Sequence, residues 1–449
     1  MDTFVIDGGR RLEGQVSING AKNAALPLMA AALLTPETVT LRDVPPLADI
    51  RSMVRLLGEL GCPRQELDPS SSTITLRSSD ETASHARYEV MRTMRAGICA
   101  LGPMLARRGF ARVSMPGGCA IGDRPVDLHL RGLAALGATI TLKGGDITAE
   151  IHDRSKRLRG ARVFLGGPFG STVLGTANVL SAACLARGTT IIESAACEPE
   201  IVDLVRMLTA MGARIEGAGS PRLIVHGVEE LSGVDHRVIP DRIEAGTFMC
   251  AAAITNGNLT LKNCPVDALM ATMDRLEAAG VHFRYIGDDG VPTNEPVDAL
   301  RATVRVTCDR VLRPVEITTQ PHPGFPTDLQ AQLMSLLTLA EGNSVITEKI
   351  FPERFLHVAE LSRMGARLFR QGPTVVVSGV RKLVGAPVMA SDLRASASLV
   401  LAGLAAEGTT TINRVYHLDR GYERMEDRLN ALGASIQRVD EKELAAAPA

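Results

Sequence analysis

A repeated helix-closing segment is the feature that most constrains how this chain can fold. Six segments share an apolar helix end followed by glycine: LLGELGC, LAALGAT, LTAMGAR, LEAAGVH, LSRMGAR and LNALGAS. Their glycines are Gly61, Gly137, Gly212, Gly280, Gly365 and Gly433, at intervals of 68 to 85 residues. Glycine directly after a helix is typical of a C-cap, where φ must be positive. We therefore expect six related units, each too long for a simple solenoid repeat.

A second recurring segment lies inside each unit, after a helix of small apolar residues. Its copies read LLTPETVTL, ARRGFARVSM, ARGTTIIES, TNGNLTLKN, AEGNSVITE and AEGTTTINR. Glycine again predicts a helix C-cap, and the Val, Ile and Thr that follow predict a strand. Each unit therefore reads as a small α/β subdomain in which a helix buries one face against a sheet, and the fold class is α/β.

Length and composition set outer limits. A chain of 449 residues is too long for one ordinary core, so we expect at least two domains. Its 45% hydrophobic and 22% charged content is globular, and a net charge of −1 gives no field for nucleic acid or an anionic membrane. The longest apolar run, residues 24–34, is too short to span a bilayer, and the N-terminus lacks a signal-peptide pattern. We expect a cytoplasmic protein without nucleic-acid or membrane partners.

The cysteines predict reduced thiols and no metal, because no CxxC pair or close histidine spacing suggests zinc. We expect no cofactor either. Cys119 stands apart in SMPGGCAIGDRPVDLH, where it follows two glycines and precedes Arg124. A thiol beside an arginine has a lowered pKa and suits a nucleophile or an acid. The alternative is a free thiol in a flexible turn. The other seven cysteines, such as Cys99 and Cys250, lie on apolar patterns and read as packing residues.

The segment SINGAKNAALPLMAAALL suggests an anion site. Lys22 and Asn23 precede Pro27, which we expect in the first turn of a helix. Free N–H groups at a helix start, with a cation beside them, attract anions. The alternative is an ordinary surface lysine.

Three further charged residues lie at expected helix starts or basic segments. Asp328, in PHPGFPTDLQAQL, begins a helix and is either functional or a routine cap. Arg394, in SDLRASASL, begins a repeat helix where the first repeat carries its lysine, which suits bidentate anion binding. Arg420 lies in YHLDRGYERMEDRL, whose Arg424 and Arg428 read instead as a solvated helix face paired with neighbouring acidic residues.

Several long motifs together resemble the UDP-N-acetylglucosamine 1-carboxyvinyltransferase family of enolpyruvyl transferases. They are GAKNAALP, PGGCAIGDRPVDLH, PDRIEAGTF, FPTDLQAQ, DLRASASLVLAG and HLDRGYERMEDRLNALGA, and they cover essentially the whole chain. The resemblance implies a two-domain inside-out α/β barrel with three repeats in each domain. One domain would span 22–239 and carry the Cys119 loop. The other would combine 1–21 with 240–435, with the active site in the cleft between them and a strand end and tail at 436–449.

The resemblance also implies a reaction. The enolpyruvyl group of phosphoenolpyruvate would move to the 3′-hydroxyl of UDP-N-acetylglucosamine through a tetrahedral ketal, with release of phosphate, as the first committed step of peptidoglycan synthesis. Cys119 would donate a proton and react with fosfomycin, Asp328 would take the hydroxyl proton, and cations would hold phosphoenolpyruvate. Those cations are Lys22, Arg124 and Arg420. The remaining implied substrate contacts are Asn23, Arg95, Pro125, Val126, Asp127, Leu128, His129, Ser171, Thr172, Val173, Ile350 and Arg394.

One segment departs from the family pattern. Family members commonly carry a PSVGAT-like stretch at the nucleotide, whereas this chain reads FGSTVLGTAN, so the match of residues 171–173 depends on register. Two alternatives stay open at this point. The shikimate-pathway enolpyruvyl transferase has the same architecture, but it typically follows the lysine with serine and lacks the cysteine loop. A non-catalytic nucleotide-sugar-binding regulator would be indicated by loss of Lys22, Cys119 or Asp328, and all three are present.

Overall fold

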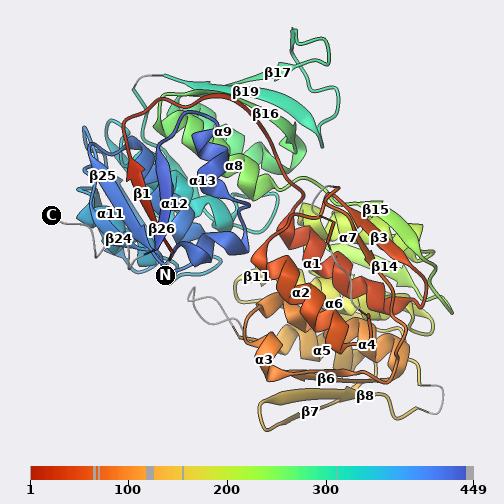
Figure 1. The fold of residues 1–449 in the computed structure, drawn as a ribbon. Coiled ribbons are helices and arrows are strands. Elements are labelled where there is room, and N and C mark those ends of the chain that lie inside the picture. The colour runs from red at the N-terminus through yellow and green to blue at the C-terminus, as the bar shows by residue number, and fades with distance from the viewer. Residues whose placement is uncertain are drawn as a thin grey trace. The chain divides into compact units, whose positions relative to one another are not determined.

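The computed structural model describes residues 2–63, 67–68, 71–117, 126–153, 156–309 and 311–440. These residues form two compact units (Figure 1). We call residues 20–239 the inserted unit, and residues 2–19 with 240–440 the discontinuous unit. The sequence had predicted the two boundaries between these units after residue 21 and after residue 239.

The inserted unit contains the following elements. Its helices are α1 (Lys22–Ala31), η1 (Ala32–Leu34), α2 (Ala48–Glu59), α3 (Tyr88–Met91), η2 (Arg95–Ala100), α4 (Leu101–Arg108), α5 (Asp127–Ala135), α6 (Val173–Cys184) and α7 (Pro199–Ala210). Its strands are β3 (Val39–Arg42), β4 (Ile74–Leu76), β5 (His85–Ala86), β6 (Phe110–Ser114), β7 (Thr139–Lys143), β8 (Asp146–Glu150), β9 (Arg162–Phe164), β10 (Gly166–Gly167), β11 (Gly170–Ser171), β12 (Thr189–Glu193), β13 (Arg214–Glu216), β14 (Arg222–His226) and β15 (Val234–Arg237).

The discontinuous unit is built in the same way. Its helices are α8 (Arg242–Ile254), η3 (Val266–Leu269), α9 (Met270–Ala279), η4 (Thr327–Leu329), α10 (Gln330–Leu337), α11 (Leu356–Arg363), α12 (Leu393–Ala405), η5 (Val415–Arg420) and α13 (Met425–Asn430). Its strands are β1 (Asp2–Asp7), β2 (Glu13–Ser17), β16 (Asn258–Cys264), β17 (Val281–Ile286), β18 (Pro292–Thr293), β19 (Ala302–Cys308), β20 (Glu316–Thr318), β21 (Asn343–Thr347), β22 (Arg367–Gln371), β23 (Thr374–Ser378), β24 (Pro387–Met389), β25 (Thr409–Asn413) and β26 (Ile436–Asp440).

Apart from the antiparallel β10-β11 hairpin, the sheets of the described residues share one topology, in which a parallel pair is extended by antiparallel strands. Four sheets follow it in full, in the orders β5-β6-β8-β7, β9-β12-β14-β13, β20-β21-β23-β22 and β24-β25-β1-β26. The sheet β2-β16-β19-β17-β18 adds a fifth strand, and β15-β3-β4 has three. The six predicted α/β repeats are therefore confirmed. Strands β1 and β2 complete sheets whose other strands come from beyond residue 240, which makes that unit discontinuous.

Six helices form the centres of the two units. In the inserted unit α1 and α4 both pack on α6, and in the discontinuous unit α8, α10 and α12 pack on one another. Every residue of α8 and α10 is buried, the polar ones at the start of each helix included. Figure 1 shows these helices inside each unit and the sheets at its periphery. Among the described residues no helix is both long and apolar enough to cross a bilayer.

The glycines that close the repeats behave as predicted. All six have positive φ, between +87° and +106°. In the second recurring segment Gly109, Gly188, Gly342 and Gly408 also have positive φ, but the prediction was wrong for Gly257. There Asn256 takes the left-handed conformation, which asparagine tolerates. Gly257 is needed for close approach instead, since a Cβ there would lie 2.5 Å from the carbonyl oxygen of Leu12.

The expected position of Pro27 in a first helical turn was also wrong. Helix α1 begins at Lys22, so Pro27 lies inside it. Because proline has no N–H, the helix lacks the bond that residue 27 would otherwise donate to the carbonyl of Asn23. The sequence pattern identified the helix correctly and placed its start too late.

Candidate active site

Each central helix, or the 3₁₀ turn that leads into it, has a charged or polar residue at its N-cap or at one of its first two positions. These residues are Lys22 for α1, Arg95 for η2 and the α4 that continues it, Thr172 for α6, Asp241 for α8, Asp328 for η4 and the following α10, and Arg394 for α12. Five of them are residues that the sequence singled out, and Asp241 belongs to a motif that it quoted. A helix N-terminus carries partial positive charge and N–H groups that bind anions. The repeats thus place candidate site residues at equivalent points of the fold.

Lys22 is held by a carboxylate in the inserted unit. Its Nζ lies 3.1 Å from Oδ2 of Asp49, and the two side chains are only 9% and 7% exposed. Asp49 comes from the first turn of α2. A buried ammonium needs such a counter-charge, because leaving water costs several kcal/mol per ion. Lys22 is therefore not a surface lysine, and Asp49 is a neighbour that the sequence pattern did not reveal.

The other candidates of the inserted unit lie at the starts of elements that pack together. Asn23 and Arg95 are half-buried at the beginnings of α1 and η2. Val126 is the buried N-cap of α5, followed by exposed Asp127 and half-buried Leu128. These residues therefore lie at element starts, and all but Val126 have partly accessible side chains.

His129 differs from its neighbours because its ring turns into the core. It is 4% exposed, and its Nδ1 lies 3.0 Å from the amide nitrogen of buried Asn178 on α6. The Asn178 amide also donates to the carbonyl of Ile98, at 2.7 Å. The His129 ring therefore joins α5 to α6 and holds the start of α5 in place.

Residues 171–173 open a helix, as the glycine-rich segment predicted. Ser171 ends the β10–β11 hairpin and Val173 is the first residue of α6. Between them the Thr172 hydroxyl accepts a hydrogen bond from the Gly175 N–H, at 3.2 Å. All three residues are half-buried.

The thiol loop lies outside the described residues, and with it Cys119, Arg124 and Pro125. Of the other cysteines, five are buried and two, Cys197 and Cys308, are half-buried. Burial raises the pKa of the Cys99 thiol to about 12. The same cause raises the pKa values of Cys184, Cys250 and Cys264 to about 12 as well. These thiols are inert at neutral pH, as expected of packing residues.

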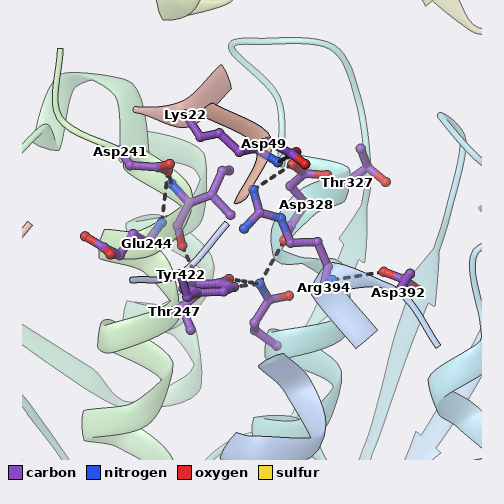
Figure 2. A network of polar contacts seen from close by, with 12 residues as sticks. Lys22, Asp49, Asp241, Glu244, Thr247, Thr327, Asp328, Asp392, Arg394 and Tyr422 are labelled. Atoms are coloured by element: carbon purple, nitrogen blue, oxygen red, sulfur yellow. Dashed lines mark hydrogen bonds and ion pairs between the residues drawn. The ribbon is translucent and has the colours of Figure 1, made fainter. Parts of the chain in front are cut away.

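Asp328 lies between two arginines in the discontinuous unit. Its Oδ1 is 2.8 Å from Nη1 of Arg354, and its Oδ2 is 3.1 Å from Nη2 of Arg394. The arginine side chains are 7% and 2% exposed, whereas Asp328 is 25% exposed. Figure 2 shows Arg394 reaching toward Asp328. Two adjacent cations favour the ionised carboxylate. Asp328 is therefore a charged acceptor with an edge open to a ligand.

Arg394 has unused donors although it is buried. The Asp392 side chain caps α12 by accepting from the Arg394 and Ala395 N–H groups, at 2.9 and 3.2 Å. The guanidinium lies over the ring of Tyr422, 5.4 Å from its centroid. Among the described residues, none forms a well-aligned hydrogen bond with its Nε or Nη1. Buried donors of this kind are normally satisfied, so they fit an oxyanion such as a carboxylate or phosphate.

Sequence reasoning missed part of this network. Gln332 donates from Nε2 to the Asp328 carbonyl at 2.9 Å and to the Tyr422 hydroxyl at 3.2 Å, and that hydroxyl lies 2.8 Å from Thr247 Oγ1 (Figure 2). Arg354 and Tyr422 both lie in segments that the sequence had already singled out, TEKIFPERF and HLDRGYERMEDRL. Their presence in those segments was the available signal.

Arg420 and Ile350 occupy the ends of other elements in this unit. Arg420 is the half-buried last residue of η5. Burial, and then the charge of Arg420, lower the pKa of His417. Ile350 is half-buried just after β21, and its N–H donates to Oε1 of Glu348 at 2.8 Å.

The interpretation of Arg428 as part of a solvated helix face was wrong. Its side chain is 17% exposed, forms an ion pair with buried Glu244 of α8, and lies over the Phe248 ring. Burial raises the pKa of Glu244, and Arg428 opposes that effect. Arg424 does behave as predicted, since it is 77% exposed and pairs with Asp427. The local sequence offered Arg428 several acidic neighbours, but the fold supplies a distant one.

Comparisons with known proteins cover nearly the whole chain. The model of the EPSP synthase (3-phosphoshikimate 1-carboxyvinyltransferase) family matches residues 6–429. A protein of Methylacidiphilum infernorum (isolate V4) named UDP-N-acetylglucosamine 1-carboxyvinyltransferase is 49% identical, over 98% of this chain and 100% of its own. A protein of the same name from Anaeromyxobacter sp. (strain Fw109-5) is 51% identical, over 98% of this chain and 99% of its own.

Solved structures agree on the fold. The enolpyruvyl transferase NikO from Streptomyces tendae has a TM-score of 0.84 and 26% identity, over 98% of this chain and 99% of that one. An EPSP synthase from Acinetobacter baumannii has a TM-score of 0.74 and 18% identity, over 98% and 100%, which bears on the fold alone. The predicted enolpyruvyl transferase fold is confirmed. With its six repeats and a family match from residue 6 to residue 429, the chain belongs to the EPSP synthase family.

Proposed function

We propose that this protein transfers the enolpyruvyl group of phosphoenolpyruvate to the 3′-hydroxyl of UDP-N-acetylglucosamine, releasing phosphate. The observation that carries the proposal is Asp328, a partly exposed carboxylate held by two buried arginines at the start of a central helix. About half of the residues are identical to those of full-length relatives named for this reaction, which supports it over the shikimate-pathway enzyme and the regulator.

In the addition step Asp328 accepts the proton of the sugar hydroxyl as its oxygen bonds to C2 of phosphoenolpyruvate. Cys119 gives a proton to the methylene carbon, so the product is a tetrahedral ketal. Elimination then breaks the C2–O bond to phosphate and removes a proton from the methyl group. A positioned base and acid contribute about 10²- to 10⁴-fold each to such proton transfers.

Cations must balance the carboxylate and phosphate of phosphoenolpyruvate throughout this sequence. Arg394 suits this role because its Nε and Nη1 are buried donors without a well-aligned partner among the described residues. Lys22 suits it as a fixed ammonium at the first residue of α1. Arg124 and Arg420 complete the proposed set.

The other proposed substrate contacts keep the residues expected from sequence. They are Asn23, Arg95, Arg124, Pro125, Val126, Asp127, Leu128, His129, Ser171, Thr172, Val173, Asp328 and Ile350. Because the His129 ring contacts buried Asn178, we propose that His129 acts by holding the neighbouring contact residues in place. We further propose that the protein acts in the cytoplasm, in peptidoglycan synthesis, and that fosfomycin inhibits it.

The test is phosphate release from phosphoenolpyruvate, with and without UDP-N-acetylglucosamine, followed by mass analysis of the nucleotide. Release that depends on the sugar, with an enolpyruvyl product, is the expected result. Binding of the sugar without release would indicate the regulator. Activity with shikimate 3-phosphate alone would indicate the shikimate-pathway enzyme.

A further inference from the structure

A buried carboxylate outside the reacting groups ties two proposed site segments together. Glu348, just after β21, is fully buried. Its Oε1 accepts hydrogen bonds from the N–H groups of Ile350 and Phe351, at 2.8 and 3.0 Å, and from the Thr319 hydroxyl at 2.6 Å. Its Oε2 accepts from the Thr327 hydroxyl at 2.9 Å. One side chain thus holds the turn that carries Ile350 and the residue that precedes Asp328.

The direction of these hydrogen bonds follows from the donors. Backbone N–H groups can only donate, so Oε1 of Glu348 must accept. The single proton of the Thr327 hydroxyl points to Oε2, and a lone pair of the same oxygen is left for another donor. Arg354 Nη1 is that donor, at 3.0 Å from Thr327 Oγ1. The same nitrogen also donates to Oδ1 of Asp328, at 2.8 Å.

We propose that Glu348 is a positioning residue for the proposed reaction, acting on Asp328 through Thr327 and Arg354 and on Ile350 through the backbone. It fixes which way the Thr327 hydroxyl points, and thereby where Arg354 and Asp328 lie. The inference rests on the proposed function, since it assigns Glu348 a part in that site. Displacement of a reacting group by about 1 Å can cost a factor of about 10² in rate.

Glu348→Gln tests the direction of these hydrogen bonds, because an amide has nearly the shape of a carboxylate but carries an NH₂ donor. If the amide oxygen stays on the two backbone N–H groups, the amide NH₂ faces Thr327 and donates to its hydroxyl. The hydroxyl must then accept from both this amide and Arg354, and its proton loses the Glu348 acceptor and has to turn away from both donors. We expect kcat to fall about 10- to 100-fold at saturating substrates. The half-time of amide exchange at Ile350 and Phe351 should shorten, whatever the turnover.

Thr327 supplies the second pair of variants, in case Glu348→Gln folds poorly. Thr327→Ser keeps the hydroxyl and should stay within about threefold of the wild type, whereas Thr327→Val should lose more. Without the hydroxyl there is no proton to lose its acceptor. Adding Glu348→Gln to Thr327→Val should therefore cost much less than it does in the wild type, a coupling that a double-mutant cycle measures.

Thr347→Val is the matched control at the last residue of β21, directly before Glu348. It removes a hydroxyl that contacts Thr374 Oγ1 at 3.2 Å and lies outside the network. The control should keep wild-type kcat, and its effect should add to that of Glu348→Gln. The proposal is overturned if Glu348→Gln keeps kcat within twofold, or if its effect simply adds to that of Thr327→Val. Absence of turnover in the wild type contradicts the proposed function itself. Unchanged amide exchange at Ile350 and Phe351 contradicts the inference that Glu348 holds this turn through the backbone.

Discussion

Arg354 and Asp328 are joined by a 2.8 Å contact between Nη1 and Oδ1, and Arg394 holds the opposite carboxylate oxygen at 3.1 Å. The carboxylate is therefore the shared counter-charge of two buried cations. The same cations suit an anionic substrate, so we expect Asp328 to have both a chemical and an electrostatic part in the proposed site. These two parts can be separated by experiment.

Asp328→Asn should lower kcat at least about 100-fold, because an amide cannot accept the sugar hydroxyl proton. It also leaves Arg354 and Arg394 without their counter-charge, which destabilises the fold. Inorganic phosphate should then raise the thermal midpoint of the variant more than that of the wild type, since an added anion replaces the lost charge. Steady-state kinetics and melting curves with a phosphate titration check both effects. Near wild-type kcat would remove Asp328 from the role of base.

Cys119→Ser should lower turnover severely without changing the thermal midpoint, because we expect the loop thiol to act in chemistry and not in packing. Fosfomycin should add one adduct to the wild type, and Cys119→Ser should stay unmodified. Cys119→Asp should retain turnover and resist the drug, since a carboxylic acid can donate the proton but alkylates poorly. Intact-protein mass spectrometry with UDP-N-acetylglucosamine present measures the adduct.

The other thiols provide an internal control for that experiment. Burial raises the pKa of Cys62 to about 11, and it raises the pKa values of four more to about 12. Thiols react as thiolates, so these residues should not compete. Several adducts per chain would contradict the assignment of the reactive thiol to Cys119.

The fold was largely predictable because its signals are local. A glycine after an apolar helix end predicts a left-handed residue from its own neighbours, and all six closing glycines have positive φ. Helix starts were less uniform, since Arg394 was placed correctly in the first turn of α12 but the start of α1 was placed too late. Either Asn256 or Gly257 could take the left-handed conformation at the end of α8, and the local pattern did not decide between them.

The contacts of the candidate site depend on tertiary packing and were not predictable. Arg354 and Asp328 are 26 positions apart, and Arg394 and Asp328 are 66 apart. The sequence identified Asp328 and Arg394 separately, through family motifs, but not the network that joins them. Local reasoning failed outright for Arg428, whose partner lies 184 positions away.

His357 should make stability sensitive to acid. It is buried on α11, and burial lowers its pKa from 6.5 to about 4, with Arg354 acting in the same direction and Asp392 opposing it. Between about pH 6.5 and pH 4 the unfolded chain binds this proton and the folded chain does not, so stability falls as pH falls through that window. The free energy of unfolding is therefore about 3 kcal/mol larger above pH 6.5 than below pH 4 on account of His357.

His357→Gln should remove that slope. The difference in unfolding free energy between wild type and variant should stay constant above pH 7 and shift in favour of the variant toward pH 4. Urea unfolding at a series of pH values measures it. Parallel curves for the two proteins would mean that His357 has the same pKa in the folded and the unfolded chain.

Arg428→Met should destabilise the discontinuous unit by about 3 kcal/mol, because it leaves the buried Glu244 carboxylate without its cation. Arg424→Met is a matched control four positions earlier. It breaks an ion pair with Asp427 whose side chains are 77% and 48% exposed, and such pairs contribute at most about 1 kcal/mol. Because burial already raises the pKa of Glu244, the loss should shrink as acid protonates this carboxylate. Equal destabilisation by the two substitutions, at neutral pH in urea, would show that Arg428 is solvated after all.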